Sequence, residues 1–345
     1  MRKLELDEVK ELMNENDGNL DLSNTDIDEL PDNLTVDGFL DLSYTNIIEL
    51  PNNLTVKDDI RLANTQISEL PYDLVVGNSI DLSFTSIEEL PDDLTVNGSL
   101  DLSCSAIKCL PNNLTVKNRL GLCGTQITYL PIDLSVGGSI DLGFTKIAEL
   151  PEEVSIGGSI YLYNTPICKL PNELIVCGDL DLSNTQINDL PENIKVGGNL
   201  YLINTQMSEL PYGIIVGGQL DISNSKIEKL PDKLTIGTDL LLNNNIDKLP
   251  SNLKLGGRIY KAIHSTKDIE INVCHTLYFG YYKDGQFVYS DGKLIFVSER
   301  KQINKFTYYK GIFKNKNAIS YKGIFTICQN FKQGYELLNS KLKYY

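Results

Sequence analysis

The chain has 345 residues and a formal net charge of −15, and its length exceeds one ordinary globular core, so two regions are expected. Residues 261–345 carry 14 Lys or Arg and 6 Asp or Glu, a charge of +8, which leaves −23 for residues 1–260. The acidic part lacks the positive surface that phosphate contacts need, which argues against nucleic-acid binding there.

Cysteine usage and hydropathy indicate the compartment. The seven cysteines are an odd number with no Cys-x-x-Cys pair, so we expect reduced thiols rather than a disulfide framework or a zinc site. The first residues lack the apolar core of a secretory signal, and no apolar run is long enough to span a membrane. These features predict a cytoplasmic protein with no membrane partner, no metal and no cofactor.

Residues 1–19 are predicted to form an N-terminal helical cap. One face of a short helix carries the apolar residues, with charged residues opposite, and Asp17-Gly18 ends it. Those apolar residues are Leu4, Leu6, Val9, Leu12 and Met13.

Residues 20–260 repeat a pattern of twenty residues for twelve turns, with the consensus L-D-L-S-N-T-x-I-x-x-L-P-x-x-L-x-V-x-G-x. A fixed period of this length predicts a solenoid, because each turn buries its apolar side only by stacking on its neighbours. The turns open at Leu20, Leu40, Ile60, Ile80, Leu100, Leu120, Ile140, Ile160, Leu180, Leu200, Leu220 and Leu240.

The turn of residues 100–119 illustrates the predicted geometry. Two leucines flank Asp101, and Leu114 alternates with Val116, which indicates two short strands per turn, each with one buried face. Each strand would pair in parallel with its equivalents in the neighbouring turns. We therefore expect a mainly β fold, a right-handed parallel solenoid with an N-terminal helical cap and a small C-terminal α+β domain.

Two further columns of the repeat carry structural expectations. Glycine recurs near the end of the turns, as at Gly138, with Asn or Asp in some turns, and these residues tolerate positive φ, so a left-handed backbone is predicted there. Threonine recurs five residues after the opening aliphatic residue, as at Thr145. We expect its hydroxyl to bond the backbone of the adjacent turn.

The run L-D-L-S-N-T-x-I-x-x-L-P resembles the leucine-rich repeat, L-x-L-x-x-N-x-L-x-x-L-P, over the greater part of the chain. It is most similar to the short form found in bacterial effectors and in repeat proteins of phages and prophages. Thr stands where the family usually has Asn, and the L-x-V-x-G strand is additional, so a straighter solenoid competes with a horseshoe. The resemblance implies protein–protein recognition by the strand face and brings no catalytic residues.

Residues 261–345 are expected to form the small basic α+β domain. Asp-Gly hairpins, further strands and a terminal helix are predicted, in chain order, at 284–285, 291–292, 306–313, 318–328 and 331–343. Basic and aromatic side chains mix here as they do in single-strand nucleic-acid binders, but a solvated surface is the favoured interpretation. The residues concerned are Lys305, Tyr308, Tyr309, Lys310, Lys314, Lys316 and Lys322.

Aspartate recurs between the two leucines of the turn, at Asp21, Asp41, Asp81, Asp101, Asp141, Asp181 and Asp221. Carboxylates stacked about 4.8 Å apart would repel by roughly 1 kcal/mol per pair even in bulk water. A solvated face that keeps the protein soluble explains such a column, and so does a docking surface for a basic partner.

Aromatic residues interrupt the same region of the repeat. Stacking of turns brings Phe144, Tyr161 and Tyr163 close together, with Tyr201 two turns further on. Exposed aromatics ringed by polar residues are typical of binding hot spots, although chance scatter in a tyrosine-rich chain is the alternative. The predicted partner-binding site is Asp101, Asp141, Phe144, Tyr161, Tyr163, Asp181 and Tyr201.

Three functions fit these features. The first is a non-enzymatic scaffold that binds a cytosolic protein, encoded by a phage or mobile element and acting in the host. The second is a structural component of a virion or assembly, and the third is an acidic DNA mimic that inhibits a nucleic-acid-binding protein. No Ser-His-Asp set, phosphate loop or metal spacing is visible, and neither histidine, His264 or His275, lies in a motif.

Overall fold

The computed structural model describes residues 2–192 and 194–261, together with the backbone of residues 297–303, 306–311, 317–321 and 324–328. The chain divides into two compact units, Met1–Met207 and Ser208–Tyr345. The division falls within the repeats, and the boundary that the sequence predicts near residue 260 stays an expectation.

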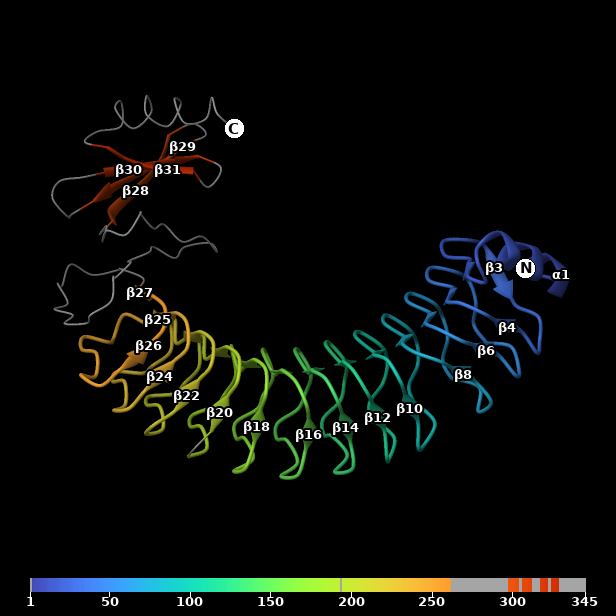
Figure 1. The fold of residues 1–345 in the computed structure, drawn as a ribbon, viewed down its shortest axis with the longest axis horizontal. Helices are drawn as coiled ribbons and strands as arrows, with labels where there is room; N and C mark the ends of the chain where they lie inside the picture. Colours follow the sequence, from blue (N-terminus) through green and yellow to red (C-terminus); the bar gives the residue numbers. More distant parts are fainter. Residues whose placement is uncertain are drawn as a thin grey trace. The chain divides into compact units, whose positions relative to one another are not determined.

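Each turn opens with a short strand that pairs in parallel with the turns before and after it (Figure 1). The register repeats from turn to turn, since Leu100 faces Ile80 on one side and Leu120 on the other. This main sheet has 13 strands in chain order. They are β2 (Leu20–Asp21), β5 (Leu40–Asp41), β7 (Ile60–Arg61), β9 (Ile80–Asp81), β11 (Leu100–Asp101), β13 (Leu120–Gly121), β15 (Ile140–Asp141), β17 (Ile160–Tyr161), β19 (Leu180–Asp181), β21 (Leu200–Tyr201), β23 (Leu220–Asp221), β25 (Leu240–Leu242) and β27 (Ile259–Lys261).

A second strand in each turn comes from the L-x-V run. These strands form three separate parallel sheets, so pairing is interrupted between β8 and β10 and again between β16 and β18. The strands are β4 (Thr35–Val36), β6 (Thr55–Val56), β8 (Val75–Val76), β10 (Thr95–Val96), β12 (Thr115–Val116), β14 (Ser135–Val136), β16 (Ser155–Ile156), β18 (Ile175–Val176), β20 (Lys195–Val196), β22 (Ile215–Val216), β24 (Thr235–Ile236) and β26 (Lys254–Leu255).

The core lies inside the turns, as the alternation predicts. In the turn of residues 100–119, Leu100, Leu102, Ile107, Leu114 and Val116 are all fully buried. Burial of such a side chain contributes roughly 1.5–3 kcal/mol, and the equivalent residues stack turn upon turn. The predicted parallel solenoid of leucine-rich turns is therefore confirmed. Among residues 2–207, the turns follow a curved path (Figure 1), which favours the bent geometry over a straight rod for that unit.

The left-handed backbone lies at other positions than the glycine column, so that prediction is wrong. One left-handed residue follows the main strand by three positions and is most often asparagine, as at Asn24 (φ 57°) and Asn64 (φ 58°). A second follows the proline corner, as at Asn33 (φ 59°). Gly138 serves a different purpose, because a Cβ there would lie 2.8 Å from the carbonyl carbon of Asn118 in the preceding turn. Close stacking of the turns, and not positive φ, favours glycine at Gly138.

The threonine column also differs from its prediction. The Thr145 hydroxyl donates to the carbonyl of Leu142, three residues earlier in its own turn, at 2.7 Å. The adjacent turn is not involved, because the side chain folds back over the corner that follows the main strand. The same bond is made by Thr25, Thr45, Thr65, Thr85, Thr125, Thr165, Thr185 and Thr205, and by Ser225.

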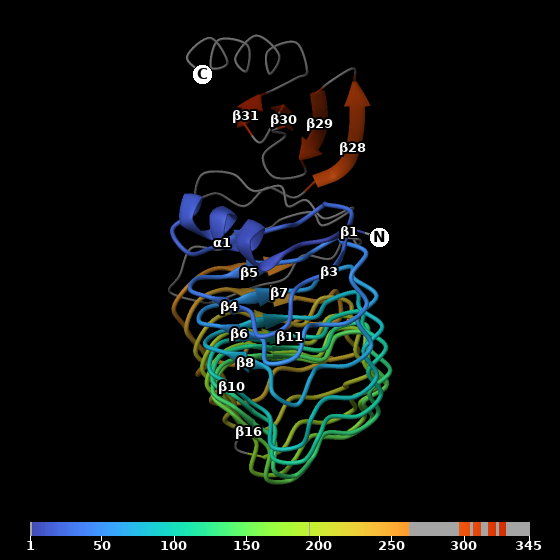
Figure 2. The same ribbon diagram turned by 90° about the vertical axis from the view of Figure 1, so that its right-hand side faces the viewer.

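The N-terminal cap contains the expected helix, α1 (Leu6–Glu15), which packs against β2 at the first turn (Figure 2). Its Val9 is fully buried, whereas Leu6 on the predicted apolar face is 38% exposed. The cap also contains a strand that the sequence did not predict. That strand, β1 (Arg2–Lys3), pairs in parallel with β3 (Ile27–Glu29).

Four antiparallel strands are described in the C-terminal region, in the order β28 (Val297–Ile303), β29 (Phe306–Gly311), β30 (Asn317–Tyr321) and β31 (Ile324–Cys328). The strand predicted near 306–313 corresponds to β29, and the segment 318–328 includes most of β30 and all of β31. The two Asp-Gly hairpins, the helix at 331–343, both histidines and Lys305, Lys314, Lys316 and Lys322 lie outside the described residues.

Candidate functional site

The outer face of the main sheet consists of the side chains that alternate with the buried leucines. They are the last residue of one turn and the second and fourth residues of the next, as in Arg119, Gly121 and Cys123. The repeat usually places small polar residues and aspartate here, so larger side chains on this face are departures from the chain's own consensus.

The aspartates of this face share one structural role. One oxygen of each carboxylate accepts the backbone N–H two residues further on, as Asp101 does from Ser103 at 2.9 Å. This short side chain-to-backbone bond closes the end of each strand and explains why aspartate recurs. The equivalent bonds are made by Asp21, Asp41, Asp81, Asp141, Asp181 and Asp221.

The aspartates do not form a continuous stack along the sheet. In the register of the sheet, carboxylates are neighbours only at Asp21 with Asp41 and at Asp81 with Asp101. Elsewhere another residue intervenes, namely Arg61, Gly121, Tyr161 or Tyr201. Repulsion along the column is therefore confined to short segments, and the face alternates acidic and aromatic side chains between β15 and β21.

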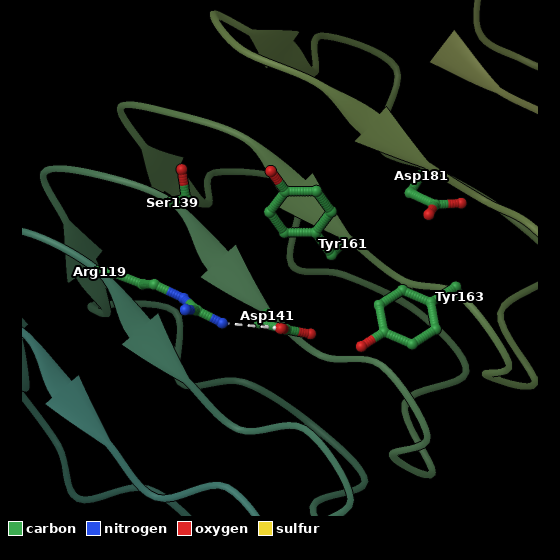
Figure 3. A pocket seen from close by; sticks show the side chains of 6 residues that line it. All are labelled: Arg119, Ser139, Asp141, Tyr161, Tyr163 and Asp181. Carbon is green, nitrogen blue, oxygen red and sulfur yellow. Dashed lines mark hydrogen bonds and ion pairs between the residues drawn. The ribbon is translucent and has the colours of Figure 1, made fainter. Parts of the chain in front are cut away.

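A cavity of about 460 Å³ opens on the outer face over strands β15, β17 and β19. Figure 3 shows the six side chains that line it, Arg119, Ser139, Asp141, Tyr161, Tyr163 and Asp181. Four of the seven predicted site residues therefore meet in one place. Phe144, Tyr201 and Asp101 lie outside the lining, and the sequence prediction missed Arg119 and Ser139.

One end of the cavity is an ion pair. The Arg119 guanidinium donates to Asp141 at 2.9 Å, and the side chain of Asp141 is only 12% exposed. Arg119 directly precedes β13, and its guanidinium reaches diagonally to Asp141 on the neighbouring strand β15. The residue that faces Asp141 in the register is Gly121, where a Cβ would come within 2.6 Å of the Asp101 carboxylate, so the missing side chain leaves space on the face.

The two tyrosines form the middle of the cavity (Figure 3). Tyr163 lies over Gly143, where a Cβ would come within 2.3 Å of the tyrosine ring, so only glycine permits this ring position. The Tyr163 hydroxyl lies 3.4 Å from the Cys123 sulfur, and its ring meets Phe144 edge-on with centroids 5.5 Å apart. These contacts hold Tyr163 in place and leave Phe144 at the rim, 60% exposed.

Burial determines the protonation of the Tyr163–Cys123 pair. Desolvation raises the pKa of the Tyr163 phenol well above its ordinary value, and the hydrogen bond to Cys123 and the nearby Asp141 carboxylate act in the same direction. Desolvation likewise raises the pKa of the Cys123 thiol. Both groups are therefore neutral at physiological pH, and the pair is not a thiolate nucleophile.

Asp181 occupies the opposite end of the cavity from Arg119 (Figure 3). Tyr161 and Tyr201 flank it on the neighbouring strands, since both pair with Asp181 in the sheet register. One carboxylate oxygen accepts the Ser183 amide at 2.9 Å. Within the described part of the chain, no Lys or Arg lies within ion-pair distance of Asp181, in contrast to Asp141.

A row of exposed aromatics borders the outer face. Tyr44, Phe84 and Phe144 are 61%, 56% and 60% exposed, and all three have left-handed backbone, with φ of 60°, 57° and 57°. Asparagine holds this position in most turns and tolerates it best, so an aromatic residue here is both strained and exposed. The sequence prediction included only Phe144. Tyr44 and Phe84 were detectable as departures from asparagine in the consensus.

The motif and the geometry together decide the kind of repeat. Every L-x-L pair forms a parallel strand with its leucines inside, and the Ile and Leu that follow at the family's spacing are buried. The solenoid is built of leucine-rich repeats. No family model matches the chain, and no curated protein matches it in sequence.

Two solved structures are similar to this leucine-rich-repeat chain. One is YopM, a leucine-rich effector protein from Yersinia pestis, with 19% identity and a TM-score of 0.41 over 73% of this chain and 81% of that one. The other is YopM from Yersinia enterocolitica WA-314, with 17% identity and a TM-score of 0.36 over 79% of this chain and 74% of that one.

Two other features are absent from the described residues. No group of three or more His, Cys, Asp or Glu side chains is arranged there to hold a metal ion. The same residues include no helix with the length and apolar character needed to cross a membrane.

Proposed function

We propose that the protein is a non-enzymatic scaffold that binds a protein partner through the outer face of the main sheet. The observation that carries this proposal is the bordering row of exposed aromatics, Tyr44, Phe84 and Phe144. Each of these residues combines an exposed ring with a left-handed backbone that costs on the order of 1 kcal/mol or more. Neither feature stabilises the fold, so a function that uses the rings accounts for them better than packing does.

The cavity beside this row supports the same conclusion. Three successive turns depart from the consensus together: Arg119, Tyr161 and Tyr163 replace smaller or acidic residues, and Gly121 and Gly143 replace aspartate and serine. These residues contribute nothing to the buried leucine core, yet they fit one another closely. Aromatic rings beside a fixed ion pair, with polar residues around them, are typical of a binding hot spot.

The test compares partner capture by wild-type protein and by the double variant Tyr161→Ala with Tyr201→Ala. Lysate of the native host supplies the partner, and mass spectrometry identifies it. We expect wild type to capture one protein in stoichiometric amount and the double variant to lose it, with an unchanged thermal midpoint because both rings lie on the outer face.

The matched control is Tyr72→Ala with Tyr129→Ala, which removes two tyrosines that are 98% and 55% exposed and lie off the main sheet. This control should capture the partner as wild type does. Capture by the folded Tyr161/Tyr201 variant at wild-type level would contradict the proposed face. Wild-type protein found only in self-assemblies or particles would instead favour a structural role, and salt-sensitive competition with DNA would favour the mimic.

A further inference from the structure

We propose that the cavity between Arg119 and Asp181 is a receptor for one arginine side chain of the protein partner, held by Asp181 between the rings of Tyr161 and Tyr163. This inference rests on the proposed function and specifies what the outer face recognises. It is carried by three observations: the charge at the end of the cavity, the rings beside it, and a second place on the same face where the chain supplies such an arginine itself.

The charge at the Asp181 end is not neutralised within the described part of the chain. Arg119 pairs with Asp141 at the other end, and the Ser183 amide satisfies only one oxygen of Asp181. The remaining oxygen belongs to a carboxylate on the lining of an open cavity. A cationic side chain is the complementary occupant, because it would pair with this carboxylate in surroundings of lower polarity than bulk water.

The rings beside Asp181 favour a planar cation. Tyr161 and Tyr163 both line the cavity, and Tyr163 is fixed there by Gly143, Cys123 and Phe144. Guanidinium stacks on aromatic faces and pairs with a carboxylate in its own plane, whereas ammonium is a compact and strongly hydrated point charge. The geometry therefore favours arginine over lysine.

The same face holds such an arginine six turns before Asp181. The Arg61 guanidinium lies 4.8 Å from the centre of the Phe39 ring and within 3.6–3.7 Å of the carboxylates of Asp41 and Asp59. An arginine thus already sits against an aromatic ring and between carboxylates of the outer face. At the cavity, the ring and the carboxylate are present and the arginine that would complete the set is not part of the described chain.

The experiment uses the full chain and short peptides by ligand-detected saturation-transfer NMR. The probes are acetyl-Gly-Gly-Arg-Gly-Gly-amide and the same peptide with lysine or with citrulline in place of arginine. Citrulline keeps the shape of arginine and removes its charge. We expect the arginine peptide to bind wild type at least roughly fivefold more tightly than the citrulline peptide. Asp181→Asn should reduce arginine binding to the citrulline level.

The matched control is Asp81→Asn. Asp81 lies in the same column and makes the same bond to the amide two residues on, at 2.9 Å, but it does not line the cavity. This variant should retain the preference for arginine. Equal binding of both peptides by wild type, an unchanged preference in Asp181→Asn, or a lysine peptide that binds as tightly as arginine would overturn the proposal.

These outcomes are independent of the proposed function. The peptides require no natural partner, so a failed preference for arginine would leave partner binding by the aromatic row intact. Conversely, loss of protein capture by wild type would overturn the scaffold and would not alter the peptide result. If both hold, Asp181→Asn should also weaken capture of the natural partner.

Discussion

A hydroxyl group closes the corner after the main strand in most turns of the solenoid. In the turn of residues 140–159, Thr145 is 3% exposed and its hydroxyl and amide both donate to the carbonyl of Leu142, at 2.7 and 3.2 Å. Ser105 holds the same position, but its buried hydroxyl has no hydrogen-bond partner in the described part of the chain. The hydroxyls of Thr145 and Ser105 can therefore be compared directly, since one is hydrogen-bonded and the other is not.

Thr145→Val should lower the free energy of unfolding by about 1 kcal/mol, because it removes one buried hydrogen bond and preserves the shape of the side chain. Ser105→Thr should raise it or leave it unchanged, since threonine at this position makes the bond in nine other turns. Urea unfolding followed by circular dichroism measures both. A Thr145→Val variant as stable as wild type would show that this hydrogen bond does not stabilise the turn.

The roles of some single residues could not be predicted from the sequence. Glycine at Gly138 has two physical explanations, positive φ and close approach of another backbone, and a repeat pattern does not separate them. The structure selects close approach, and places positive φ at positions such as Asn24 and Phe144 instead. Likewise, the sequence predicted that Tyr161 and Tyr163 lie together, but Arg119 was missed because its diagonal contact with Asp141 depends on the space left at Gly121.

At the scale of the elements, the two strands of each turn behave differently. The period of twenty residues predicted both strands and their parallel pairing, because the inward positions of both strands are aliphatic in every turn. It did not predict the interruptions in the second set, which fall between β8 and β10 and between β16 and β18. Val75 and Ile175 belong to strands that border these interruptions and are 54% and 72% exposed, where other turns mostly carry threonine or serine.

Amide hydrogen exchange tests these interruptions. The Lys117 amide donates to the carbonyl of Val96 at 3.0 Å, and the Gly197 amide to that of Val176 at 2.9 Å, so both should be protected. The equivalent amides of Asn97 and Cys177 follow the interruptions and should exchange at least about tenfold faster, because opening there breaks no ladder bond. Mass spectrometry of peptic fragments that separate these amides provides the comparison. Equal protection would show that the second sheet is continuous in solution.

At the scale of the whole molecule, charge and the outer face point to one kind of partner. Residues 1–260 carry a charge of −23, and two arginines of the outer face, Arg61 and Arg119, are already paired with carboxylates. A partner with a basic, arginine-bearing surface would be attracted by this charge and would bind more weakly as salt is added. Composition and repeat pattern suggested only a basic partner, whereas the preference for arginine depends on the side chains that the fold brings together around Asp181.

Site-specific photo-cross-linking in lysate of the native host tests directly whether a protein partner binds the outer face of the main sheet. One variant carries benzoylphenylalanine in place of Phe144, which lies on the rim of the cavity and is 60% exposed. The comparison variant carries it in place of Tyr72, which lies off the main sheet and is 98% exposed. We expect a single cross-linked protein from position 144 and none from position 72. Cross-linking of the same protein from position 72 alone, or of no protein from position 144, would contradict binding by the outer face.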